Sequence, residues 1–195
     1  MPAVTGHGAD VLAVVEAAYR EHFEVLPARA SVSFVGVEEL EVLRYADGEL
    51  RHYVSLGMSR YPMADPNDLV IDAGNAPRSE LLITTAGQPD DLWRRLAVLA
   101  AAPAVEGAVY TAGTRIDLNE PLCAGSRCTG AVLADGPMKA IRVSGMADVK
   151  LLSLLPATAS ELAWARVHGS EALRQRWTEA RTDLSDLARE PVALG

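Results

Sequence analysis

The chain has 195 residues, of which 49% are hydrophobic and 23% charged, and its 18 Lys and Arg against 26 Asp and Glu give a formal net charge of −8. This composition is typical of a globular protein and excludes general disorder. The acidic balance argues against partners such as nucleic acid or an anionic membrane, because both require a basic surface. The length predicts a single domain over 1–195, with its core at roughly 10–188.

The sequence shows no pattern for export or membrane insertion. Its densest apolar run, 96–105, is far shorter than the ~18 residues of a membrane span and contains Pro103. The first ten residues lack the basic segment and apolar core of a secretory signal. We therefore expect a cytoplasmic protein. Two cysteines in a cytoplasmic chain of this length usually stay reduced, although the sequence leaves open whether Cys123 and Cys128 pair.

The first half of the chain predicts one helix and then a cluster of strands. A helix is expected from Asp10 to Leu26, ended by Pro27, because apolar residues recur there at helical spacing. Its apolar stripe comprises Val11, Val15, Tyr19, His22 and Leu26. Strands are predicted over 31–35, 40–45 and 50–56, with a turn at 46–49. Residues 58–77, rich in Pro, Asp, Asn and Gly, predict a long irregular loop of a length usually associated with function or mobility.

The second half alternates strands with helices. Strands are predicted over 79–85, 109–116, 131–134 and 149–155. A helix is expected to begin at 89–90 and to be stopped by Pro103, and the last third of the chain is helical. The order of elements predicts an α+β fold, in which a mixed β-sheet packs against flanking helices.

Two helices are expected near the C-terminus. Thr158 and Glu161 have the spacing of a capping box, and the short helix that they begin is expected to end at Gly169. Ser170 is expected to cap the final helix. Its one-sided apolar stripe, which predicts core packing, comprises Leu173, Trp177, Ala180, Leu184 and Leu187.

Most familiar catalytic motifs are absent from the sequence. No glycine-rich phosphate loop joins a strand to a helix, and no Gly-x-Ser-x-Gly motif is present. The two cysteines have no second ligand pair, and the histidines occur singly, so we expect no metal and no cofactor. The four histidines are His7, His22, His52 and His168.

The carboxylates of the long loop are the one unusual polar set. Asp65, Asp68 and Asp72 are spaced by three and four residues, which suits a cation or a basic partner. Asx-turns in a solvated loop explain the same spacing. An enzyme that uses this loop together with His52 is one alternative function, and a small-molecule or peptide sensor with an apolar pocket is another.

Residues 51–59 (RHYVSLGMS) carry a resemblance to a known family. In the suppressor of fused (SUFU) family, an aromatic strand likewise runs into a Ser-apolar-Gly-apolar-Ser segment. Further blocks resemble the family in the same order from Tyr19 to Trp177. They are the Glu80-bearing strand 79–85, the helix start 91–96 at Trp93, Gly113, the strand 132–135, and 151–162 followed by Gly169 and Leu173.

The resemblance implies a SUFU-like N-terminal-lobe fold and a role in binding other proteins without catalysis. Animal members clamp a peptide between two lobes, with the peptide added as a strand, and this chain resembles only the N-terminal lobe. Bacterial single-domain members resemble immunity proteins, which neutralise a toxin partner. The implied partner is therefore another protein or peptide, with a cognate toxin as one possibility.

The resemblance also suggests where a partner binds. The residues that it assigns to partner binding are Tyr53, Ser55, Gly57, Ser59, Asp65, Asp68 and Glu80. The negative net charge is expected to steer a basic partner towards this surface. A competing interpretation places Tyr53 in the core, since aromatic residues of strands usually pack inward, and treats the loop as merely solvated.

Overall fold

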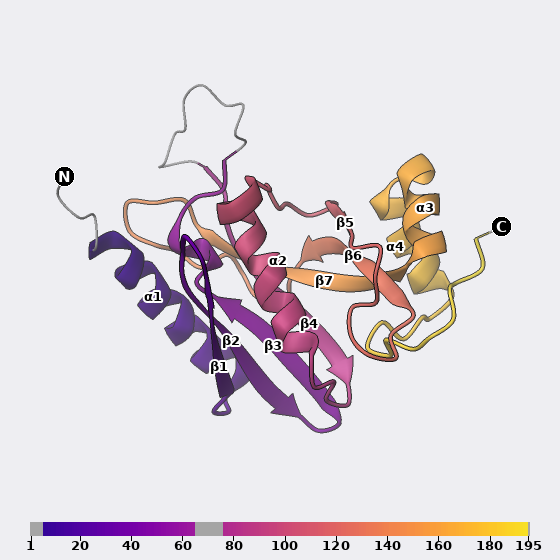
Figure 1. Ribbon diagram of the computed structural model, residues 1–195, viewed down its shortest axis with the longest axis horizontal. Helices are drawn as coiled ribbons and strands as arrows, with labels where there is room; N and C mark the ends of the chain where they lie inside the picture. The colour runs from indigo at the N-terminus through magenta and orange to yellow at the C-terminus, as the bar shows by residue number, and fades with distance from the viewer. Residues whose placement is uncertain (1–5, 65–75, 195) are drawn as a thin grey trace.

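A seven-stranded sheet runs through the protein, in a computed structural model that describes residues 6–64 and 76–194 (Figure 1). The strand order is β1-β2-β3-β4-β7-β6-β5. The strands are β1 (Ala28–Phe34), β2 (Val37–Asp47), β3 (Leu50–Leu56), β4 (Arg78–Ala86), β5 (Arg115–Asp117), β6 (Cys128–Asp135) and β7 (Val149–Thr158). Strands β4 and β7 pair in parallel, whereas the other neighbouring strands are antiparallel. The predicted mixed sheet is confirmed.

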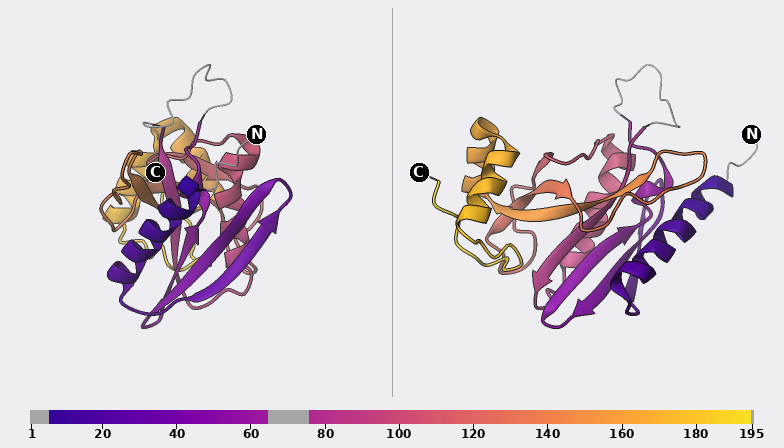
Figure 2. Two further views of the ribbon diagram at one scale, coloured as in Figure 1. Left: turned by 90° about the vertical axis from the view of Figure 1, so that its left-hand side faces the viewer. Right: turned by 180° about the vertical axis from the view of Figure 1, so that it is seen from behind.

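Helices cover both faces of this sheet. They are α1 (Gly6–Phe23), α2 (Leu92–Glu106), α3 (Ala159–His168) and α4 (Ser170–Glu179), and a short 3₁₀ turn, η1 (Met58–Arg60), follows β3. Figure 2 shows α1 running diagonally across the back of the sheet, with α3 and α4 at the opposite end. Helix α2 lies on the front face. The α+β architecture expected from the sequence is therefore confirmed.

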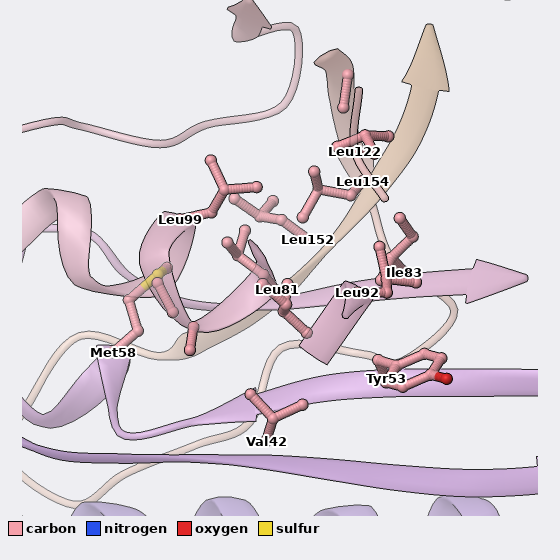
Figure 3. Packing of buried hydrophobic residues seen from close by; sticks show 14 of the residues in the cluster. Val42, Tyr53, Met58, Leu81, Ile83, Leu92, Leu99, Leu122, Leu152 and Leu154 are labelled. Carbon is pink, nitrogen blue, oxygen red and sulfur yellow. The ribbon is translucent and has the colours of Figure 1, made fainter. Parts of the chain in front are cut away.

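Alternation along the strands distributes the apolar side chains among three clusters. Leu152 and Leu154 of β7 face the α2 side, where Tyr53, Leu81 and Leu92 also pack (Figure 3). The residues that alternate with these two along β7 face the other way, because successive side chains of a strand point to opposite faces. There Leu151 packs with α1, and Leu155 packs against the cluster of α3 and α4. Trp177 is buried, as its apolar stripe predicts, in a cluster separate from that of Tyr53.

Helix α1 is shifted towards the N-terminus relative to its prediction. It begins at Gly6 and ends at Phe23, because Glu24 has a left-handed backbone conformation with φ 55°. Its buried stripe therefore ends at Tyr19. His22 is exposed, and Leu26 is 91% exposed, so the last two members of the predicted stripe do not belong to the core.

Pro103 does not stop α2. The helix continues to Glu106 and ends at Gly107, whose left-handed backbone (φ 68°) lets its N–H bond to the carbonyl of Ala102. An interior proline has a φ that suits a helix, but it removes one backbone hydrogen bond and crowds the carbonyl four residues earlier. The packing of Leu96, Leu99 and Ala100 in the core offsets this cost, so the helix continues past the proline.

Two further boundaries differ from the predictions. The strand expected over 109–116 is reduced to β5, since Gly113 sits in a turn with φ 92°. Helix α4 ends at Glu179, leaving Leu184 and Leu187 in the segment after it. Ser170 does not cap α4: its hydroxyl donates to the carbonyl of Gly113 at 2.7 Å.

The segment after α4 is held by a buried ion pair. Arg189 donates to both carboxylate oxygens of Glu161, at 2.8 Å each. The same carboxylate accepts from Trp177 Nε1 at 3.0 Å and from the backbone N–H of Val192 at 2.9 Å. Glu161 also completes the predicted capping box with Thr158, which is confirmed. One carboxylate thus joins α3, α4 and the C-terminal segment.

Candidate functional site

Three of the residues that the sequence assigned to partner binding converge on the buried carboxylate of a fourth, Glu80. Glu80, on β4, is fully buried. Its Oε1 accepts hydrogen bonds from the backbone N–H groups of Gly57 and Ser59, at 2.9 Å each, and from the Ser59 hydroxyl at 2.7 Å. Its Oε2 accepts from the Ser55 hydroxyl at 2.5 Å. The end of β3 and the turn that follows it are therefore wrapped around a side chain of the neighbouring strand.

Glycine is required at the centre of this turn. Gly57 has φ 132°, in a range that residues with a Cβ rarely adopt. A Cβ built there lies 2.7 Å from Cδ2 of Leu40, so a side chain would also collide with β2. The glycine thus has two roles: it permits the bend after β3, and it admits Leu40 as a close neighbour.

Two other side chains complete the network. Arg78 donates from one terminal nitrogen to the carbonyls of Ser59 and Arg60, at 2.8 Å each. Burial lowers the pKa of its guanidinium. The hydroxyl of Tyr19, on α1, donates to the carbonyl of Ser55 at 3.1 Å. Burial, and then the nearby charge of Glu80, raise the pKa of Tyr19 well above its usual value of 10.0.

Tyr53 lies in the core on the α2 side and is 1% exposed. Its hydroxyl donates to the carbonyl of Pro89 at 3.4 Å. The interpretation of Tyr53 as a contact anchor requires an accessible ring, and this structure does not present one. Ser55, Ser59 and Glu80 are equally buried, so contact of these side chains with a partner stays a prediction.

The aspartates of the long loop lie outside the described residues. These are Asp65, Asp68 and Asp72, all between Ala64 and Ala76. Their role in binding a basic partner also stays a prediction.

The turn that this network holds, Gly57 together with η1, forms one wall of a groove that the sequence did not predict. The groove measures about 510 Å³ and lies between η1, the β1–β2 turn and the C-terminal part of α2. Its apolar lining includes Val37, Leu40, Met58, Pro103 and Ala104. No local pattern pointed to it, because its three walls come from segments far apart in the chain.

An ion pair marks the rim of this groove. Arg60 Nε lies 2.9 Å from the Glu38 carboxylate, and the hydroxyl of Tyr61 donates to the same carboxylate at 2.7 Å. This hydrogen bond raises the pKa of Tyr61, whose side chain is 54% exposed. Nearby Val35 is fully exposed. The groove therefore combines an apolar floor with a fixed polar edge, as protein-binding sites do.

The cysteines are free and buried. Burial raises the pKa of Cys123, and it raises that of Cys128 to about 11. Both thiols are therefore protonated at neutral pH, which leaves little thiolate for nucleophilic chemistry. In the part of the chain that the structure describes, no group of three or more His, Cys, Asp and Glu side chains is arranged to hold a metal ion.

Within residues 6–64 and 76–194, no helix is both long enough and apolar enough to cross a membrane.

Comparison with known proteins supports the family resemblance seen in residues 51–59. The family model described as suppressor of fused protein (SUFU) matches residues 36–190. No curated protein sequence matched the chain. Among solved structures, a SUFU homologue from Neisseria gonorrhoeae superposes with a TM-score of 0.67 at 17% identity, covering 96% of this chain and 97% of the other.

Two further structures share the fold. A chain of the Sufu–Fu complex structure matches with a TM-score of 0.67 at 14% identity, over 95% of this chain and 91% of that one. Drosophila Suppressor of Fused matches with a TM-score of 0.66 at 14% identity, over 93% of this chain but 50% of its own length. The family match covers most of the chain, and it includes the turn that Glu80 holds. The chain belongs to the suppressor of fused (SUFU) family.

Proposed function

We propose that this chain acts by binding another protein, without catalysis, in the groove beside η1. The proposal rests on one observation: an apolar groove is lined by a turn that the hydrogen bonds of Glu80 hold rigid. A preorganised surface binds with less loss of conformational entropy than a mobile one. The family supports the same role, since one of the matching structures is a complex named for Sufu and Fu.

In this proposal, the buried signature residues act on the partner indirectly. Ser55, Ser59 and Glu80 hold η1 in place, so that Met58 and Tyr61 face the groove. Gly57 itself lines the groove and allows the close approach to Leu40. Tyr53 supports the same region from the core.

We propose a basic protein as the partner, with a cognate toxin as the first kind to test. The net charge of −8 favours such a partner and predicts association that weakens with salt. Asp65 and Asp68 are proposed to contribute to this attraction. An immunity role follows from the resemblance to bacterial single-domain members.

The test begins with co-purification of the chain from its native host and identification of bound proteins by mass spectrometry. Binding of the identified partner is then measured for Ala104→Arg, which places a bulky side chain at an exposed position of the groove wall. Ala163→Arg, at an exposed position on α3, makes the same change far from the groove. We expect at least about tenfold weaker binding for the first variant and no change for the second.

Equal binding by both arginine variants would place the interface elsewhere. The charge proposal is tested separately by Asp65→Lys combined with Asp68→Lys. That variant should weaken binding and reduce its dependence on salt.

A further inference from the structure

A second cavity, of about 590 Å³, opens on the face of the sheet opposite α2. It lies between the end of α1 and the connection that follows β6, both of which are on the near side in the back view of Figure 2. The groove proposed for the protein partner lies on the α2 side, so the two sites are independent. The volume suits a small ligand or one protein side chain.

The floor of the cavity is a row of side chains on adjacent strands. Tyr45 of β2 pairs with His52 of β3, which in turn pairs with Thr84 of β4. Because paired residues lie side by side on the same face of a sheet, their side chains form a continuous strip. Nδ1 of His52 and Oγ1 of Thr84 are hydrogen-bonded at 2.8 Å, which orients the imidazole. Ser153 of β7 extends the lining.

Aromatic rings form one wall. Phe23, at the end of α1, stacks on Tyr45 with ring centroids 4.1 Å apart and lies 5.6 Å from the ring of His52. Phe23, His22, Tyr45 and His52 all line the cavity. Tyr45 is 1% exposed and Phe23 covers one face of its ring, so the half-buried Phe23 is the ring of this pair that a ligand can reach. An aromatic ring in the wall of a cavity attracts organic cations.

The charged lining residues are of one sign. Asp47 and Asp135 line the cavity, and the lining includes no lysine or arginine. Burial lowers the pKa of His52, and His22 lowers it further although Asp47 opposes the shift. His52 is therefore mainly uncharged at neutral pH. Carboxylates beside aromatic rings, with no competing cation in the lining, favour a positively charged ligand.

We propose that this cavity binds an organic ammonium ion, held by the ring of Phe23, which stacks on Tyr45, and by the carboxylates of Asp47 and Asp135. The ammonium group belongs either to a free small amine or to a lysine side chain of another protein. The site does not depend on the groove beside η1, and either one stands if the other fails.

The test compares two probes that differ only in charge. Choline and its uncharged carbon isostere, dimethylbutanol, are titrated into the ¹⁵N-labelled protein at pH 8, above the range in which histidine side chains usually titrate. We expect choline to shift the amide signals of His52, Thr84 and Asp135 with a millimolar or tighter Kd. The isostere is expected to bind at least about threefold more weakly.

Matched variants separate the charge from the shape. Asp47→Asn and Asp135→Asn should each weaken choline binding about three- to fivefold, and Phe23→Leu about threefold. Glu49→Gln makes the same charge change two residues from Asp47, in the same turn but outside the lining, and should leave binding unchanged. Urea unfolding of each variant verifies that the fold is retained.

A capped Gly-Lys-Gly peptide distinguishes the two sources of the ammonium group. If the peptide binds more tightly than choline, a lysine of a partner is the ligand, whereas tighter binding of choline identifies a free amine. The proposal is overturned if both choline and the peptide fail to bind, if the isostere binds as well as choline, or if the aspartate variants behave like Glu49→Gln.

Discussion

The carboxylate of Glu80, near the start of β4, accepts a 2.9 Å hydrogen bond from the backbone N–H of Gly57, the first residue after β3. The turn that ends β3 is therefore held by its neighbouring strand and not by its own residues alone. Four donors saturate this buried carboxylate, two from the backbone and two from serine hydroxyls. Saturation of this kind offsets the cost of burying a charge.

Glu80→Gln should destabilise the protein strongly although it keeps the size of the side chain. The amide has one acceptor oxygen where the carboxylate has two, and its NH₂ group would face donors. We expect the free energy of unfolding to fall by about 2–4 kcal/mol. Urea denaturation followed by circular dichroism measures the change.

The exposed Glu49→Gln substitution serves as the control for loss of one charge. It is expected to change the free energy of unfolding by less than about 0.5 kcal/mol. If both variants lose the same stability, the network around Glu80 does not hold the turn.

Gly57→Ala should lower the free energy of unfolding by more than the unfavourable φ alone would. Alanine at this position meets both an unfavourable φ and the side chain of Leu40, 2.7 Å from the new Cβ. We expect a loss of about 2–4 kcal/mol. Gly87 also has a positive φ, 74°, but a Cβ built there meets open space. Gly87→Ala should therefore lower the free energy of unfolding by about 1 kcal/mol. A ratio near one between the two losses would show that the contact with Leu40 is unimportant.

The Glu161–Arg189 pair should make stability depend on pH in the acidic range. Burial alone would raise the pKa of Glu161, but the hydrogen bonds from Arg189, Val192, Thr158 and Trp177 outweigh it and leave the pKa below 4.5. A carboxylate whose pKa is lower in the folded state stabilises the protein above its unfolded pKa. That contribution is lost as the pH falls through the folded pKa.

Unfolding of the wild type and of Glu161→Gln, measured from pH 7 to pH 2.5, tests this dependence. Glu161→Gln should be less stable than the wild type at pH 7, and the difference should shrink below about pH 4.5. A difference that is constant with pH would contradict the assignment of this carboxylate as charged in the folded protein.

The two thiols should react slowly with a disulfide reagent while the protein is folded. Cys123 and Cys128 are buried and their pKa values are raised, that of Cys128 to about 11. Since the thiolate is the reactive form, the rate at pH 8 should rise at least about a hundredfold in urea. Fast labelling of the native protein, comparable with that of free cysteine, would contradict this burial.

The sequence by itself determined the features that depend on neighbouring residues. The turn at 46–49 contains Asp47 and Gly48, and it joins β2 to β3 as expected because glycine adopts the positive φ of the turn. The capping box of Thr158 and Glu161 also formed as predicted. Both rely on contacts within a few residues. The exceptions, such as the continuation of α2 through Pro103, arise where packing outweighs a local preference.

Family membership was also visible in the sequence, through the spacing of Ser55, Gly57 and Ser59 and the later Glu80. The arrangement of these residues in space was not visible in the sequence. Ser55 and Glu80 are 25 positions apart, and only the antiparallel pairing of β3 with β4 brings them together. The sequence could assign these residues to one region. It could not show that their side chains are buried and stabilise the turn after β3.

The tertiary structure alone decided which surfaces the protein presents. Tyr53 points into the core because β3 packs that face against α2, while His52, one residue earlier, faces the cavity beside α1. The groove beside η1 and the cavity around His52 each have walls from segments distant in the chain. A local pattern of residues specifies the face of a strand, whereas the position of its partners follows from the packing of the whole sheet.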